Sequence, residues 1–466
     1  MTGQPLEQRS SIAGRALTRA AGTRLVPGNA VRLLLDGPEA FPAMLDTIAQ
    51  AERWLHFENY IIRSDATGWR FAEALAGRAR AGIPVRLLYD WLGSKTTSRR
   101  LFRELRAAGV DVRAFGPLQL FNLLANVLRD HRKLVVADGR RAIVGGLCIG
   151  DEWSGDSTRG IQPWRDTAIE VIGPAAASFD RAFEGTWTRA GGTIPPEEQV
   201  GEVQASGDAE VGVIVGEPRR ARVLRVTSLL AAGATDRLWI TDAYLLAPRA
   251  LFQGLLDAAR DGVDVRLLLP GSSDVPLIRN LTRIGYRELL KAGVRIFEWE
   301  GAMLHAKTIV ADGRWCRIGS SNLNGSSLFG NFELDALVDN PALASELEAQ
   351  FRRDIARSAE VERRPARGPR RLQRVLPTGL DWEPPEVPPG PHHRRFRERR
   401  GRTVLALRIL ASGARRSIFA PVAIILGVLG LLFAFLPRVM AMGVAALCAW
   451  LAIGAAIEAF RRRTEP

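Results

Sequence analysis

The chain has 466 residues, 47% of them hydrophobic, so it is long enough for two or three domains with a sizeable core. It carries 64 Lys and Arg against 50 Asp and Glu, a formal net charge of +14, which favours a polyanionic partner, either nucleic acid or an anionic membrane surface. Its three cysteines lie far apart without a Cys-x-x-Cys pair, which argues against a disulfide framework and a zinc site.

Strand and helix patterns alternate in the first third of the chain, which predicts an α/β layer architecture. The expected elements are strands over Val31–Leu35, Trp54–Arg63, Val85–Asp90 and Val110–Phe115, and helices over Phe41–Trp54, Phe71–Ala81 and Arg99–Ala108. An apolar segment follows between Gly116 and Asp130. It is either a core helix or a lining for lipid acyl chains.

The second half of the chain repeats the same order of predicted strands and helices. Leu238–Leu246 resembles Leu55–Ile62, Val265–Leu269 resembles the strand at Val85, and Tyr286–Val294 resembles Phe102–Val110. We therefore expect two homologous α/β units that face each other, with a hinge in the Gly-Pro-Glu-rich stretch from Gly191 to Gly207.

The C-terminal part contains two uncharged runs, 418–436 and 439–457, separated by Pro437-Arg438. Each has about the 20 residues that a membrane-spanning helix needs. Arginines flank the pair at both ends, so the positive-inside rule predicts a transmembrane helical hairpin with both termini and the catalytic part cytoplasmic. The alternative is a buried helix pair in a soluble core.

These patterns predict six segments. They are an N-terminal tail (1–27), a first unit (28–198), a hinge (199–208), a second unit (209–360), a basic Pro/Arg-rich linker (361–414) and the hairpin (415–460).

A motif of His-x-Lys, four residues and Asp occurs twice. The first copy is His131, Lys133 and Asp138, and the second is His305, Lys307 and Asp312. The whole chain has only four lysines and five histidines, so the repetition is unlike that of two ordinary alternating strands. In a strand, the His and Lys of each copy point to the same face. Each Asp falls on the opposite face, which leaves open whether it acts in the site or in the fold.

Two imidazoles and two ammonium groups around one pocket suit a phosphodiester. One histidine attacks phosphorus and the other protonates the leaving alkoxide, while the lysines offset charge on the phosphate oxygens. The motifs bring no metal-ligand cluster, and no metal or cofactor is expected.

Each histidine needs a carboxylate on its second ring nitrogen. Asp166 and Glu333, downstream of the two motifs, are the candidates, although either could be a plain surface charge. Ser320 and Asn322 are candidate phosphate-binding donors after the second motif. Gly146 stands at the position of Ser320 in the first copy, and Cys148 at that of Asn322, so we expect an asymmetric pocket.

The two motifs, Gly-Ser-Ser-Asn after the second, and Pro-Trp-Arg-Asp at 163–166 resemble the phospholipase D superfamily. Within it, HRKLVVADGRRAIVGG, LHAKTIVADGRWCRIGSSNL, GNAVRLLLDGPEAF and ENYIIR resemble bacterial cardiolipin synthases, over roughly residues 28–352. Family members usually carry asparagine where Cys148 stands, and many have their membrane spans at the N-terminus.

The resemblance implies two phospholipase D-like α/β sandwich units related by a pseudo-twofold axis. It implies metal-independent phosphatidyl transfer from phosphatidylglycerol to another lipid alcohol, through a phosphohistidine on His131, with His305 as general acid and then base. It places the protein in a bacterial inner membrane, with anionic phospholipid and the bilayer as partners and no nucleic acid. A phospholipase D-type lipid hydrolase, a nuclease of the same superfamily and an inactive membrane scaffold remain as alternatives.

Overall fold

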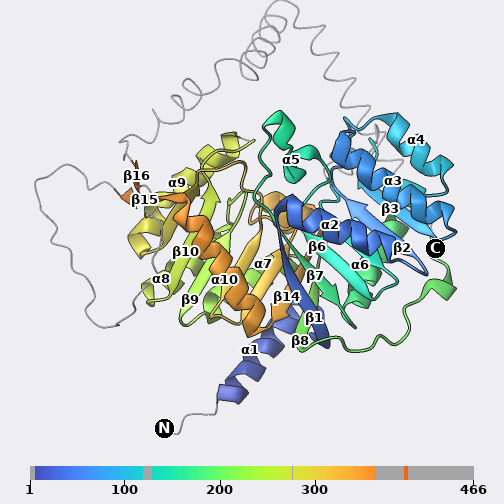
Figure 1. The fold of residues 1–466 in the computed structure, drawn as a ribbon. Helices are drawn as coiled ribbons and strands as arrows, with labels where there is room; N and C mark the ends of the chain where they lie inside the picture. The colour runs from blue at the N-terminus through green and yellow to red at the C-terminus, as the bar shows by residue number, and fades with distance from the viewer. Residues whose placement is uncertain (1–5, 119–127, 275, 364–392, 397–466) are drawn as a thin grey trace, which may run out of the picture. The chain divides into compact units, whose positions relative to one another are not determined.

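The computed structural model describes residues 6–118, 128–274, 276–363 and 393–396 (Figure 1). They form a mixed α/β fold with one sheet of sixteen strands, in the order β16-β15-β11-β10-β9-β12-β13-β14-β8-β1-β7-β6-β5-β2-β3-β4. The two central strands, β1 (Val26–Leu35) and β8 (Ala209–Gly216), pair antiparallel. From this pair outward, the sheet follows the same course in both directions.

The other strands of the first half are β2 (Leu55–Asn59), β3 (Val85–Asp90), β4 (Asp111–Phe115), β5 (Lys133–Ala137), β6 (Arg141–Gly145) and β7 (Thr167–Ile172). Those of the second half are β9 (Arg237–Thr241), β10 (Asp264–Pro270), β11 (Arg295–Trp299), β12 (Thr308–Ala311), β13 (Trp315–Gly319), β14 (Glu333–Asp339), β15 (Ser358–Arg363) and β16 (His393–Phe396). Each half has three neighbouring parallel strands, β2-β3-β4 and β9-β10-β11.

The two motifs lead into strands that return antiparallel beside these parallel strands. His131, His305 and Lys307 precede β5 and β12, so the expectation that His and Lys of each copy share one strand face is wrong. Lys133 at the start of β5 pairs with Asn59 at the end of β2. Thr308 at the start of β12 pairs with Thr241 at the end of β9. Both motifs therefore begin at the carboxyl ends of parallel strands, where ligand sites of α/β proteins usually lie.

Helices cover the sheet on both faces, and Figure 1 shows α2 and α10 in front of it. They are α1 (Leu6–Ala21), α2 (Asp36–Ala49), α3 (Ala66–Arg80), α4 (Arg99–Ala107), α5 (Asp151–Ser154), α6 (Ala176–Arg189), α7 (Arg222–Gly233), α8 (Arg249–Arg260), α9 (Pro276–Ala292) and α10 (Pro341–Ala356). Short turns of 3-10 helix lie at Ser157–Arg159 and Pro196–Glu198, and a π-helical turn, η4, at Ser326–Gly330.

Some helices and strands begin or end at other residues than the sequence predicts. The helix expected from Phe71 begins at Ala66, because the Asp65 carboxylate accepts a hydrogen bond of 2.9 Å from the Gly68 amide and caps the helix there. The strand expected over Trp54–Arg63 ends at Asn59. The segment expected as a tail contains α1 and the start of β1.

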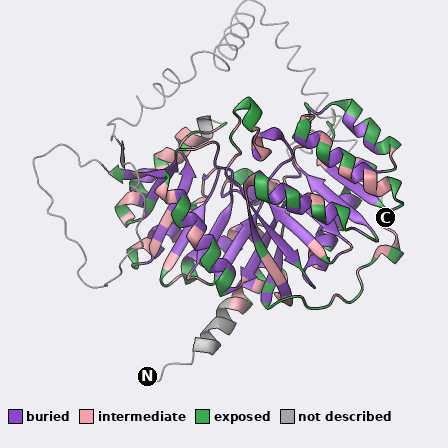
Figure 2. Ribbon diagram, viewed as in Figure 1, coloured by how far each residue is buried: buried purple, intermediate pink, exposed green. Residues whose placement is uncertain are grey.

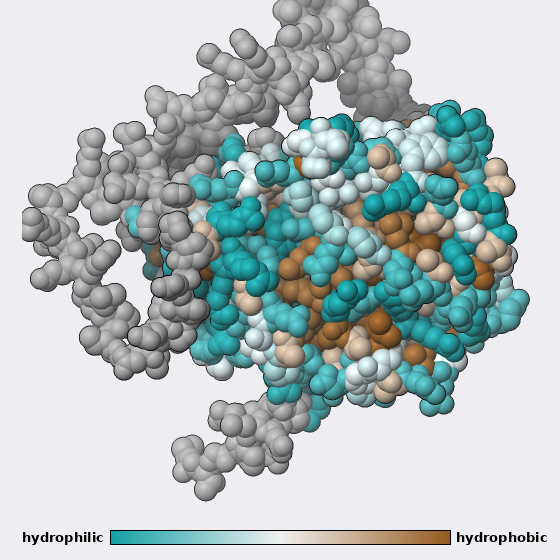
Figure 3. Space-filling model, in the orientation of Figure 1, coloured by the Kyte–Doolittle hydropathy of each residue, from teal (hydrophilic) through white to brown (hydrophobic). Residues whose placement is uncertain are grey.

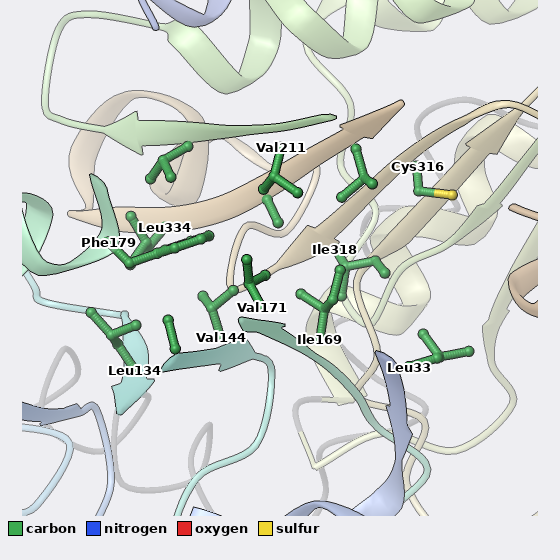
Figure 4. Packing of buried hydrophobic residues seen from close by; sticks show 14 of the residues in the cluster. Leu33, Leu134, Val144, Ile169, Val171, Phe179, Val211, Cys316, Ile318 and Leu334 are labelled. Carbon is green, nitrogen blue, oxygen red and sulfur yellow. The ribbon is translucent and has the colours of Figure 1, made fainter. Parts of the chain in front are cut away.

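Two apolar cores hold this arrangement. One lies between the first-half strands and α2, α3 and α4, and includes Phe41, Phe71 and Leu101. The other joins strands of both halves, with Leu134 and Val144 of the first half in the same cluster as Ile318 and Leu334 of the second (Figure 4). Each such fully buried side chain contributes about 1.5–3 kcal/mol. Figure 2 accordingly shows the strands buried and the helices exposed on their outer sides.

The outer surface is mainly polar. Figure 3 shows one face that is mostly hydrophilic, with apolar side chains gathered near its middle, in the region of α2 and β1. Most of the apolar segment expected between Gly116 and Asp130 lies outside the described residues, since 119–127 are not among them.

The expected localisation requires correction. In the part of the chain that the structure describes, no helix has both the length and the apolar character to span a membrane. The longest, α9 with 17 residues, contains Arg279, Arg283 and Arg287. This finding contradicts the predicted multi-pass bacterial inner-membrane protein. The runs 418–436 and 439–457, on which the hairpin prediction depended, lie outside the described residues.

Candidate active site

Each motif histidine is held by backbone bonds to the other half of the chain. The His131 amide donates to the Phe332 carbonyl at 2.9 Å, and the Phe332 amide to the Arg129 carbonyl at 2.8 Å. In the same way, the His305 amide donates to the Arg165 carbonyl at 2.7 Å, and the Arg165 amide to the Met303 carbonyl at 2.9 Å. These short parallel bridges bring the residue after Phe332 and the residue after Arg165 beside the opposite histidine.

The carboxylate partners are exchanged between the halves. Glu333 of the second half lies with Oε2 3.0 Å from His131 Nδ1. Asp166 of the first half lies with Oδ2 2.7 Å from His305 Nδ1. Both acids are fully buried. Because a carboxylate accepts the Nδ1 proton, Nε2 of each neutral ring is the unprotonated atom and the one left for chemistry.

Both lysines are fully buried beside these rings. Lys133 Nζ donates to the His131 carbonyl, and Lys307 Nζ to the His305 carbonyl. Lys133 Nζ also lies 5.0 Å from the centre of the Tyr60 ring, a cation–π distance. An ammonium group has three hydrogens, so each lysine keeps donors for an anionic ligand.

Burial controls the charge of the bases. It lowers the pKa of His305 to about 4, and Lys307 and Lys133 act in the same direction. Burial likewise lowers the pKa of His131, and among the charges that act with it is Lys307. Each histidine thus feels the lysine of the other motif, so the four groups share one electrostatic environment. Burial also lowers the pKa of Lys307 to about 8.

The two acids respond to the same surroundings in the opposite sense. Burial alone would raise the pKa of Asp166, but the His305 ring and Lys307 outweigh it and the pKa is lowered. The pKa of Glu333 is lowered against burial by His131, Lys133 and the hydrogen bond from Ser320. Both acids are therefore suited to remain ionised while they orient the histidines.

The expected phosphate-binding positions differ between the halves. The Ser320 hydroxyl donates to Glu333 Oε2 at 2.5 Å and accepts from the Leu334 amide at 2.9 Å, so its one proton is already used on Glu333. Gly146 lies against the Asp166 carboxylate, because a Cβ there would lie 2.2 Å from Asp166 Oδ1. Ser320 therefore hydrogen-bonds to the acid of its site, whereas Gly146 leaves room for the other acid.

Asn322 and Cys148 are both buried, and Cys148 lies near enough to Lys133, Asp166 and Lys307 for their charges to act on its thiol. Asn322 Oδ1 accepts no hydrogen bond from the described residues. Burial raises the pKa of the Cys148 thiol, which keeps it neutral. A thiol is a weak donor compared with an amide, so the first half lacks the polar group that the second half has at this position.

Asp138 and Asp312 lie at the far ends of the two motif strands, in the left-handed region with φ of 57° and 51°. The Asp138 carboxylate accepts from the amides of Glu52, Arg53 and Trp54 at 2.8–3.0 Å. Asp312 binds the amides of residues 235–237 in the same way, at 2.9–3.0 Å. The structure therefore assigns both to the turn before a parallel strand rather than to the histidine cluster.

Replacing Asp138 with alanine is expected to lower the free energy of unfolding by about 2 kcal/mol, because backbone donors lose a charged acceptor. The specific activity of the folded protein should stay unchanged. Denaturant titration and activity at a temperature where the variant is folded would measure both. A large loss of specific activity with unchanged stability would contradict the structural role.

Aromatic residues around the histidines were not singled out as site residues from the sequence. The rings of Trp153, Trp164 and Tyr244 lie with their centres 5.8, 5.6 and 6.2 Å from that of His305. Tyr60 lies 4.8 Å from His131. Tyr60 and Tyr244 follow the ends of β2 and β9, and Trp164 precedes Arg165-Asp166. The available signals were therefore the end of a parallel strand for the tyrosines and the neighbouring acid for Trp164.

The arrangement can perform displacement at phosphorus with two bases and two cations. In the described part of the chain, no group of three or more His, Cys, Asp and Glu side chains is placed to hold a metal ion.

The chain is similar to known proteins over most of its length. Residues 229–355 match the family described as "Cardiolipin synthase, PLD-like domain". The chain is 33% identical over 371 residues to cardiolipin synthase A of Pseudomonas aeruginosa, an alignment that covers 78% of this chain and 74% of that protein. The chain belongs to the cardiolipin synthase family of the phospholipase D superfamily.

Further relatives of this cardiolipin synthase family member are similar over most of its length. It is 31% identical to the cardiolipin synthase of Oceanobacillus iheyensis, with 72% of this chain and 71% of that protein aligned. Its fold is similar to the crystal structure of phosphatidylserine synthase from Haemophilus influenzae Rd KW20. There the TM-score is 0.61 at 14% identity, over 75% of this chain and 92% of that one.

Proposed function

We propose that the protein is a cardiolipin synthase that transfers a phosphatidyl group from one phosphatidylglycerol to a hydroxyl of a second, with release of glycerol. The observation that carries this proposal is the pair of histidines, each with a buried carboxylate from the other half on Nδ1. The family relationship supports the lipid substrate, since the relatives are named cardiolipin synthases.

In the first step, His131 Nε2 attacks phosphorus of phosphatidylglycerol. A bond forms between nitrogen and phosphorus while the bond from phosphorus to the glycerol oxygen breaks. Protonated His305 gives its Nε2 proton to that oxygen, so glycerol leaves neutral. Lys133 and Lys307 bind the non-bridging oxygens as charge builds on them.

In the second step, a hydroxyl of another phosphatidylglycerol replaces glycerol. Neutral His305 takes its proton, the oxygen attacks phosphorus, and the bond to His131 breaks. His305 ends the cycle protonated and His131 free. The anionic phosphate between the lysines offsets their charge, so its arrival raises the proton affinity of His305 from the low value of the empty site.

The surroundings of the site favour a lipid alcohol over water. Trp153, Trp164 and Tyr244 pack around His305, where the second alcohol must bind. At the same end of the parallel strands, large apolar side chains are exposed. Leu92 follows β3 and is 40% exposed, and Leu118 follows β4 and is 57% exposed. Such side chains suit the acyl chains of a substrate better than a polynucleotide.

The deciding experiment gives the purified full chain phosphatidylglycerol in the presence of a chelator and separates the products. Cardiolipin with an equal amount of glycerol is the expected result. Phosphatidic acid as the main product would replace the synthase by a lipid hydrolase. No lipid product, with cleavage of DNA instead, would favour a nuclease.

The rate should fall on the alkaline side because Lys307 must be charged to bind phosphate oxygens. With a pKa of about 8, it is protonated below that pH and loses its charge above it. We expect kcat/KM, which reports groups of the free enzyme, to fall about tenfold per pH unit above about pH 4, where His305 loses its proton, and by a further factor of about ten per unit above about pH 8, where Lys307 loses its charge. In Lys307→Arg the further fall above pH 8 should disappear, because arginine stays charged, although the rate at the optimum will be lower.

The matched control for this profile is Lys291→Arg, at the end of α9 and away from the motifs. It should leave the profile unchanged. A second break near pH 8 that persists in Lys307→Arg would show that another group causes it.

A further inference from the structure

A cavity of about 380 Å³ lies outside the histidine cluster, between α6, the end of β8 and the loop that follows β8. Neither the motif histidines nor the motif lysines line it. Its polar lining is dominated by arginines from both halves of the chain and one acid. These residues are Arg132, Arg181, Arg189, Arg220, Arg222 and Glu217.

The positive charge of this cavity is only partly balanced. Glu217 lies 3.1 Å from Arg220 and 3.8 Å from Arg222, so one carboxylate serves two guanidinium groups. Arg181 donates to the Ser178 hydroxyl at 2.8 Å, and Arg189 stacks 5.1 Å from the Phe332 ring. Among the described residues, neither of these two pairs with a carboxylate. Burial, helped by Arg220 and Arg225, lowers the pKa of Arg222, as expected where cations crowd.

At the corresponding position of the other half, the positive charge of the arginine is neutralised by carboxylates. Arg165 precedes Asp166 as Phe332 precedes Glu333, and Asp36 follows β1 as Glu217 follows β8. Arg165 Nε lies 3.0 Å from an Asp354 oxygen, and Arg165 Nη1 lies 3.2 Å from Asp36. There, two carboxylates serve one arginine. The excess of cations around the cavity is therefore not repeated at the corresponding position of the other half.

We propose that this cavity binds a phosphate-bearing anion, either free phosphate or the headgroup phosphate of an anionic phospholipid, at a site separate from the histidines. Guanidinium groups recognise phosphate through paired N–H donors, and a cavity lined by several arginines suits a phosphate, which offers more acceptor oxygens than a carboxylate. The volume accommodates a headgroup, while the polar lining does not suit acyl chains.

Two residues that line the cavity also form hydrogen bonds with the His131–Glu333 pair. Phe332, which lines the cavity, accepts the His131 amide through its carbonyl at 2.9 Å. Arg132, also in the lining, donates through Nε to the Glu333 carbonyl at 3.2 Å and through Nη1 to the Ala182 carbonyl of α6 at 2.9 Å. An anion in the cavity would therefore contact residues that position the nucleophile.

The test measures binding of inorganic phosphate to the full chain in nonionic detergent by calorimetry, and binding to phosphatidylcholine vesicles with and without phosphatidylglycerol. Arg181→Gln/Arg189→Gln should weaken binding at least about tenfold, since two charge-assisted contacts are lost. Lys133→Gln/Lys307→Gln, which removes both motif cations, should still bind phosphate as the wild type does, and this separates the cavity from the motifs. The control Arg99→Gln/Arg103→Gln, on the exposed side of α4, should leave binding unchanged.

The vesicle arm identifies the source of the phosphate. Weakening of inorganic phosphate binding in the double variant supports a site for free phosphate. Weakening confined to phosphatidylglycerol vesicles supports a lipid headgroup site. Arg220→Gln should also weaken binding. It serves as an independent variant in case the double variant does not fold. The proposal is overturned if the wild type binds neither probe saturably, if the double arginine variant binds both probes as the wild type does, or if Lys133→Gln/Lys307→Gln loses binding that the arginine variants keep. It does not depend on which lipid the protein makes.

Discussion

His131→Ala is expected to reduce phosphatidyl transfer by at least about 10⁴-fold, because the covalent route is lost with its nucleophile. His305→Ala should cost about 10²–10⁴-fold, the usual contribution of a general acid. The two losses differ in kind. A phosphodiester with a nitrophenolate leaving group needs no proton, so it should restore the first step in His305→Ala and leave His131→Ala inactive.

The same substrate should make the intermediate visible. In His305→Ala, the first step proceeds while the second lacks its base, so an acid-labile phosphoryl group should accumulate on residue 131 and be detectable by mass spectrometry of peptides. Label on residue 305 in His131→Ala would reverse the assignment of the two histidines. His56→Gln is the control, since the His56 ring is bound to Asp180 at 2.6 Å outside the cluster. It should accumulate no label and turn over normally when folded.

The exchange of carboxylates between the halves gives the second large effect. Glu333→Gln should lower kcat by about 10²–10⁴-fold, because an amide in place of the carboxylate no longer fixes the proton on Nδ1 of His131. Asp166→Asn should have a comparable effect through His305. Because the two acids serve different histidines, their effects should depend on different backgrounds.

In His305→Ala with the nitrophenyl substrate, Asp166→Asn should cause no further loss, since the ring it orients is gone. Glu333→Gln should keep its full effect there, because it orients His131. The opposite pattern, with Glu333→Gln silent and Asp166→Asn harmful, would mean that each histidine uses the acid of its own half. Thermal unfolding of each variant, compared with wild type, separates these effects from loss of fold.

Much of the architecture could be predicted because strands and helices depend on local periodicity. The strand at Val85–Asp90 has the predicted bounds, and the helix from Arg99 ends one residue early, at Ala107. The helix at Ala66 was misplaced by five residues because its start depends on the Asp65 cap rather than on apolar spacing. The expected strand to Arg63 was too long because the chain leaves the sheet at Asn59, where the site begins.

Some features of the candidate site could likewise be predicted from the sequence, and others could not. The sequence pointed to Asp166 and Glu333 as orienting acids but not to the histidine that each serves, since that depends on two bridges between the halves. It proposed Ser320 as a substrate donor, whereas the hydroxyl holds Glu333. It left the role of Asp138 open, and the turn that this residue stabilises lies more than eighty residues earlier in the chain.

The sequence by itself determined the chemical set, because two His-x-Lys repeats supply two imidazole and two ammonium groups. It did not determine their local structure, since His131, His305 and Lys307 precede β5 and β12 instead of lying on a strand. Only the tertiary structure decided which carboxylate orients which ring, why His305 and Lys307 have low pKa values, and where unbalanced arginines gather around a cavity. Those properties arise from burial and from contacts between residues far apart in the chain, which no local pattern encodes.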